Sequence, residues 1–83
     1  MALEKSGAFF CYNIFMRFNE RLKELRIEKQ LSQQELADLV STGQSSISAW
    51  ERGAREPLAH QLIDLARVFD CSVDYLLGIS DIK

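Results

Sequence analysis

The sequence predicts an all-α protein of five short helices. Apolar residues recur three or four positions apart along most of the chain, the spacing of one helix face, and no strand-like alternation or internal repeat appears. With 83 residues, 47% of them hydrophobic and 27% charged, the chain is large enough for one small globular domain. One proline and four glycines also suit a globular fold better than a disordered chain.

The first helix is predicted at about residues 19–29. Phe18, Leu22 and Leu25 fall at positions i, i+4 and i+7 and therefore form one apolar stripe along it. Several lysines and arginines lie between these apolar positions. They either form a solvated face together with their acidic neighbours or contribute to an anion-binding surface.

Two further helices are predicted on either side of a tight turn. Ser32 and Glu35 have the spacing of a capping box, so a second helix should start there and run to about Val40. Gly43 suits the N-cap of a third helix that runs to about Arg52. Their packing contacts should come from Leu36, Ala37, Val40, Ile47 and Trp50. This is the spacing of a helix-turn-helix, whose second helix can enter the major groove of DNA.

The remaining helices follow two loop signals. Gly53 suits a left-handed residue at the end of the third helix, and Pro57 disfavours helix in the residue before it. A fourth helix is predicted at about residues 58–69 from its apolar face. A fifth, short helix at residues 73–77 should end at Gly78.

Charge argues mildly against a nucleic-acid partner. The net charge is −2 and the isoelectric point is about 5.3. Residues 17–55 nevertheless hold seven lysines and arginines against six acidic residues, whereas residues 56–83 hold two against five. Phosphate contact therefore depends on which basic side chains share a face. The candidates are Arg17, Arg21, Lys29, Arg52 and Arg55.

Other function classes have little support. Cys11 and Cys71 lie sixty positions apart and, with the single His60, make a poor metal set, so we expect no metal or cofactor and reduced thiols in a cytoplasm. The longest apolar run, residues 8–16, is too short to cross a membrane. No nucleophile–base set, glycine-rich phosphate loop or suggestive carboxylate pair is present, so we expect no enzyme.

Four motifs in order resemble the phage-repressor-like (Xre-type) helix-turn-helix family. They are RLKELR at 21–26, LSQQELA at 31–37, ISAWERG at 47–53 and DYLLG at 74–78. The resemblance covers about residues 17–78. It implies five helices, a homodimer that binds a palindromic operator in double-stranded DNA, and repression of transcription.

The resemblance also implies roles for single residues. Gln33 matches a glutamine that bonds a phosphate and braces the third helix. Gln44 matches the first base-facing position, where an amide can bind adenine N6 and N7 together. Ser45 and Ala49 match further base-facing positions.

Further matched positions face the DNA backbone or stabilise the fold. Ser46 and Ser48 are expected to approach phosphates, or bases through water. Arg52 and Arg55 lie where the loop of the family meets the sugar-phosphate backbone. Arg26 and Glu51 match a structural ion pair between the first and third helices.

The chain departs from the family pattern in the turn and at two base-facing positions. Ser41 replaces the usual glycine and would have to accept a positive φ. Thr42 stands where a buried valine is common. Gly43 and Ala49 offer no hydrogen-bonding side chain, which leaves most of the direct readout to Gln44 and Ser45. Specificity is then modest, or depends on a thymine methyl contact and on DNA shape.

Each of these roles has an alternative explanation. Gln33 and Gln44 could be exposed polar residues at helix starts. Trp50 has the bulk to stack on bases, but its spacing from Ile47 favours the core. Residues 75–77 could pack on the fourth helix or form a dimer surface. The competing function is a protein-interaction module on the same fold, similar to an antitoxin or an antirepressor. Its partner would be a toxin or a protein antagonist. The acidic charge of the chain favours this alternative.

The chain divides into an arm, a domain and a tail. Residues 17–78 form the helix-turn-helix domain, and residues 79–83 form a C-terminal tail. Residues 1–16 are unusually aromatic. This arm either reflects an upstream start, with Met16 as the family-like beginning, or packs on the domain or between subunits.

Overall fold

The computed structural model describes residues 17–83, and these residues contain five α-helices and no strand. The helices are α2 (Phe18–Glu28), α3 (Gln33–Leu39), α4 (Gln44–Arg52), α5 (Ala59–Phe69) and α6 (Val73–Leu76). The all-α prediction is confirmed, and each helix starts and ends within about one residue of its predicted place. The expectations for the arm at residues 1–16 lie outside the described residues.

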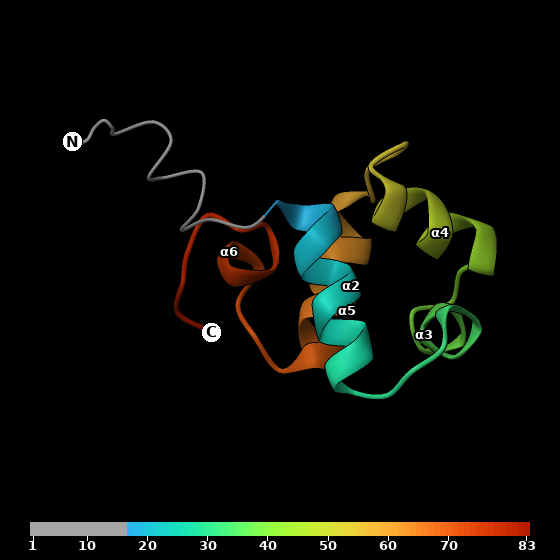
Figure 1. The fold of residues 1–83 in the computed structure, drawn as a ribbon, viewed down its shortest axis with the longest axis horizontal. Coiled ribbons are helices and arrows are strands. Elements are labelled where there is room, and N and C mark those ends of the chain that lie inside the picture. The colour runs from blue at the N-terminus through green and yellow to red at the C-terminus, as the bar shows by residue number, and fades with distance from the viewer. Residues whose placement is uncertain (1–16) are drawn as a thin grey trace.

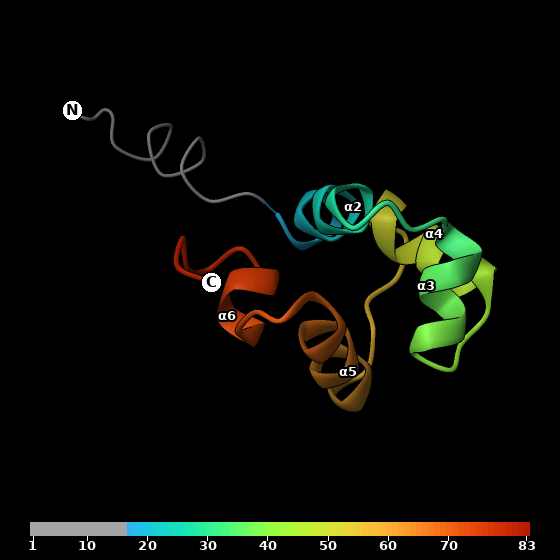
Figure 2. The same ribbon diagram turned by 90° about the horizontal axis from the view of Figure 1, so that it is seen from below.

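Helix α2 lies in the middle of the molecule. α4 packs on both α2 and α3, whereas α6 packs on α5 and α2. Both views therefore show α3 and α4 together at one end and α6 at the other (Figures 1 and 2). This arrangement leaves the outer surfaces of α3 and α4 uncovered by other described helices.

Local chemistry fixes the geometry of the pair α3 and α4. The Ser32 hydroxyl accepts from the Glu35 amide at 3.0 Å, while the Ser32 amide donates to Glu35 Oε1 at 2.8 Å, so the predicted capping box is present. Ser41 takes a φ of 56° in the turn, as the sequence required, and Gly43 is the N-cap of α4. Gly53 ends α4 with a φ of 76°.

One apolar core joins all five helices. Its fully buried large side chains are Leu22, Leu36, Ile47, Leu65 and Leu76, one from each helix. Burying a side chain of this size contributes about 1.5–3 kcal/mol. Trp50 is 3% exposed, so it belongs to this core and its surface is closed to bases.

Arg21 links α2 to α6 rather than facing solvent. Its guanidinium donates to the Tyr75 carbonyl at 3.0 Å, lies 3.8 Å from the centre of the Tyr75 ring, and pairs with Glu24 at 3.6 Å. The residue is 4% exposed. The expectation that Arg21 could contribute to a phosphate surface is therefore wrong, and Tyr75 packs against the domain.

Two wider features of residues 17–83 bear on function. None of their helices combines the length and the apolar character that a bilayer crossing demands. No three of their His, Cys, Asp or Glu side chains gather closely enough to hold a metal ion.

Candidate nucleic-acid interface

The first turn of α4 presents polar side chains outward. Gln44 and Ser45 are exposed, whereas Ile47 and Trp50 point into the core and hold the helix against α2 and α3. The short turn at Ser41 sets α4 at an angle to α3, as both views show (Figures 1 and 2). The start of α4 is therefore a solvent-facing helix end that Ile47 and Trp50 anchor to the core.

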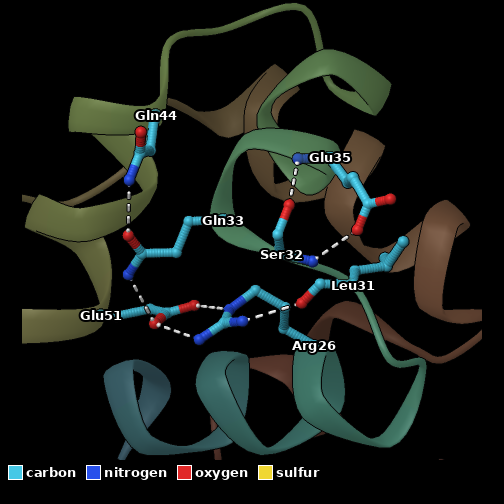
Figure 3. Close-up of polar contacts among 7 residues, drawn as sticks. All are labelled: Arg26, Leu31, Ser32, Gln33, Glu35, Gln44 and Glu51. Atoms are coloured by element: carbon cyan, nitrogen blue, oxygen red, sulfur yellow. Dashed lines mark hydrogen bonds and ion pairs between the residues drawn. The ribbon is translucent and has the colours of Figure 1, made fainter.

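The expected ion pair between α2 and α4 is present. Arg26 Nε lies 2.6 Å from Glu51 Oε2, and Arg26 Nη2 lies 3.2 Å from Glu51 Oε1 (Figure 3). Arg26 Nη1 also donates to the Leu31 carbonyl at 2.8 Å. The side chains are 13% and 4% exposed, so this two-pronged pair is shielded from water.

Two glutamines extend this pair to the surface. Gln33 Nε2 donates to Glu51 Oε1 at 3.2 Å, and Gln44 Nε2 donates to Gln33 Oε1 at 3.2 Å (Figure 3). We call this chain of four side chains, which are Arg26, Glu51, Gln33 and Gln44, the α2–α4 polar network. Sequence reasoning named all four residues but not the two glutamine bonds, because their partners lie eighteen and eleven positions apart, too far for the spacing of one helix to indicate a contact.

The other candidates on α4 differ in exposure. Ser45 is exposed, while Ser46 and Ser48 are half-buried. Ser48 Oγ accepts from Arg52 Nε at 3.4 Å, so Arg52 lies along its own helix. Ala49 is only 5% exposed, which leaves its methyl group little surface for a ligand to touch.

Three basic residues share one surface hollow beside α4. Arg17, Arg52 and Arg55 line an open hollow of about 360 Å³, together with Gly53 and Glu56. We call this feature the basic hollow. Lys29 lines a different hollow with Lys83, and Arg21 is buried, so three of the five candidate cations lie together. Arg52 and Arg55 are both exposed.

Charge within α4 is favourable to an anionic partner. The helix has no acidic residue in its first turn, where the backbone amides carry partial positive charge. Its one acidic residue, Glu51, is held by Arg26 and is nearly closed to solvent. The carboxylate of Glu51 should therefore repel a phosphate group only weakly.

Cys71 lies away from this surface, between α5 and α6. Burial raises the pKa of its thiol above the usual cysteine value, and the positive charges of Lys83 and Arg21 partly oppose that rise. The thiol is therefore protonated near neutral pH and a poor nucleophile. Nothing in its position links it to the interface of α3 and α4.

Two helices joined by a tight turn, with the second one held at the surface, define a helix-turn-helix protein. The helix-turn-helix family profile matches residues 22–76. The HTH-type transcriptional regulator YobD of Bacillus subtilis (strain 168), whose name calls it uncharacterized, is 37% identical over 62 residues, which cover 75% of this chain and 55% of YobD. The chain spans about half the length of the curated relatives it matches.

Solved structures give the same result. The c2 repressor of phage P22 in complex with a synthetic operator has a TM-score of 0.74 and 32% identity, covering 78% of this chain and 98% of that one. SinR of Bacillus subtilis in complex with DNA has a TM-score of 0.67 and 34% identity, covering 72% and 97%. SinR is also known in a complex with the protein SinI. The chain belongs to the phage-repressor-like (Xre-type) helix-turn-helix family.

Proposed function

We propose that this protein is a sequence-specific DNA-binding transcriptional regulator of the cytoplasm. It acts as a repressor that binds a palindromic operator as a homodimer, with α4 in the major groove. The observation that carries the proposal is the Gln33–Gln44 hydrogen bond at the exposed start of α4, which holds an amide ready to meet a base edge. No catalytic step is part of it, because the named relatives are regulators of transcription.

Base readout falls mainly on the first turn of α4. The free groups of the Gln44 amide can match N6 and N7 of adenine, and Ser45 stands exposed beside it. Ala49 is assigned a thymine methyl contact, but its 5% exposure makes that contact small. Specificity should therefore rest on few direct contacts and on the shape of the DNA.

Phosphate contacts are assigned to the surroundings of that turn. They come from Gln33, Ser46, Ser48, Arg52 and Arg55. The last two line the basic hollow, where a sugar-phosphate backbone would neutralise them. Such contacts release counterions, so affinity should fall steeply as salt rises.

The structural relatives support DNA as the partner, and the homodimer is our own inference. The P22 repressor structure holds an operator, and one SinR structure holds DNA. A homodimer would present its two α4 helices about 34 Å apart, one turn of the double helix. A palindromic site with half-sites about ten base pairs apart is the expected consequence.

A second candidate is a protein-interaction module on the same fold. The SinR–SinI complex and the net charge of −2 favour a protein partner, which would act as an antagonist or a toxin. The two functions differ in salt dependence. Contact with DNA phosphates weakens steeply with salt, whereas a largely apolar protein interface does not.

The test is a selection from random duplex DNA at moderate salt with the full chain, followed by sequencing. We expect a palindrome, and we expect Gln44→Ala to lose about 1–3 kcal/mol of binding to it with an unchanged melting temperature. Gln34→Ala is the matched control, because Gln34 is exposed on α3 and bonds Asp38 instead. A folded protein that enriches no sequence would contradict the proposal and favour the interaction module.

A further inference from the structure

The α2–α4 polar network has a direction that its chemistry dictates. Glu51 is a carboxylate held by Arg26, so it can only accept hydrogen bonds. Gln33 must therefore turn its Nε2 toward Glu51, which it meets at 3.2 Å. Its Oε1 then faces the opposite way, toward Gln44. The buried acid thus decides which end of the Gln33 amide reaches the surface.

The same constraint passes to Gln44. Because Gln33 presents an oxygen, Gln44 must offer it an N–H, and the two atoms lie 3.2 Å apart (Figure 3). An amide nitrogen carries two N–H groups and the amide oxygen accepts. One N–H is thereby occupied, which leaves Gln44 with one donor and one acceptor for a ligand.

One donor beside one acceptor distinguishes the two purines. Adenine offers the N7 acceptor and the N6 donor in the major groove, which complement this pair of groups. Guanine offers two acceptors, N7 and O6, and would need both N–H groups of Gln44. The Gln44 oxygen would then face an acceptor of guanine and be repelled by it.

We infer that the Arg26–Glu51 pair, acting through Gln33, sets the base preference of Gln44 and makes it reject guanine. Glu51 and Gln33 are in this sense positioning residues for base readout. The inference rests on the proposed function, since it presumes that Gln44 meets a base. If the acid at position 51 is replaced by an amide, Gln33 can turn either way, and Gln44 can offer either pattern of groups.

The test compares base preference in wild-type full-length protein and in Glu51→Gln, Gln33→Met and Gln44→Ala. Each protein is used in the same selection from random duplex DNA, and the position that loses its preference in Gln44→Ala is taken as the Gln44 position. We expect wild type to favour adenine over guanine there by on the order of tenfold or more. In Glu51→Gln and Gln33→Met that ratio should fall to less than about threefold.

A control separates readout from stability. Ser72→Ala removes the capping hydrogen bond to the Tyr75 amide and weakens the start of α6, which lies at the opposite end of the molecule from the α2–α4 polar network (Figure 1). It should lower the melting temperature and leave the adenine-to-guanine ratio unchanged. Gln33→Met keeps the Arg26–Glu51 pair, so it decides the matter if Glu51→Gln does not fold.

The outcomes separate the inference from the proposed function. If both variants keep the wild-type ratio while Gln44→Ala loses it, the inference is overturned and the DNA-binding function stands. A wild-type preference for guanine at that position would overturn the inference together with the adenine assignment, while sequence-specific DNA binding would stand. If wild type enriches no sequence, or Gln44→Ala changes no position, both the base assignment and the inference are overturned.

Discussion

Arg26→Met removes the cation that faces a nearly buried acid. Glu51 is 4% exposed, so its charge would remain shielded from water with only the Gln33 amide as a side-chain donor. Removing one partner of such a pair costs about 3–5 kcal/mol. The Leu31 carbonyl also loses the guanidinium bond of 2.8 Å, which favours the upper half of that range.

Urea unfolding followed by circular dichroism measures this loss. With a slope of about 1–3 kcal/mol per molar for a small protein, the midpoint should fall by about 1 M or more. If the variant is already partly unfolded in buffer, an excluded osmolyte restores the folded baseline. The control is Glu28→Gln, which breaks a pair with Lys83 whose 4.0 Å separation and 54–58% exposure predict a loss under about 1 kcal/mol.

The double variant Arg26→Met, Glu51→Leu tests the cause of the loss. Removing the stranded acid as well should recover part of the stability, because a matched apolar pair avoids the cost of burying one charge. A loss below about 1 kcal/mol in Arg26→Met would refute the argument, since the pair would then behave like an exposed one. No recovery in the double variant would refute it as well.

Three smaller changes test the backbone and the thiol. Ser41→Gly should raise the free energy of unfolding by about 0.5–1 kcal/mol, because glycine adopts a φ of 56° without steric cost, and a lower melting temperature would contradict this. Gly53→Ala should lower the free energy of unfolding by about 1–2 kcal/mol, measured by the same thermal unfolding. The cause is the φ of 76° and not crowding, because the new Cβ would lie 3.7 Å from Asn19. Cys71 should react slowly with iodoacetamide at pH 8 and faster as the pH rises, because its raised pKa keeps the thiol protonated. Peptide mass spectrometry measures the rate of alkylation at this residue. A rate equal to that of the urea-unfolded chain would contradict the prediction.

The helices and their caps were predictable because their causes are local. The spacing of Ser32 and Glu35, and the glycines at 43 and 53, fix helix ends through bonds and backbone angles a few residues apart. The positive φ of Ser41 was also predictable, since the family motif has glycine there. Short-range chemistry therefore determined the boundaries of α3 and α4.

Contacts between distant residues were harder to predict. Arg21 looked like a surface cation, but its guanidinium lies on Tyr75, 54 positions along the chain. The base-facing role of Ala49 stays a prediction, but the motif did not predict that the residue would be only 5% exposed. Both outcomes depend on how α2, α4 and α6 pack, which no local pattern specifies.

The acidic composition of the chain is compatible with a DNA-binding face because charge is distributed unevenly in space. Two of the basic residues, Arg21 and Arg26, serve the fold, but Arg26 also neutralises the one acid of α4. Arg52 and Arg55 remain exposed at the basic hollow, beside the uncharged first turn of α4. A partner that meets this face therefore meets local positive charge, whatever the net charge of −2. The test is local as well: Arg55→Gln should reduce the salt slope of DNA binding by about one, whereas Arg67→Gln, at the exposed end of α5, should leave it unchanged.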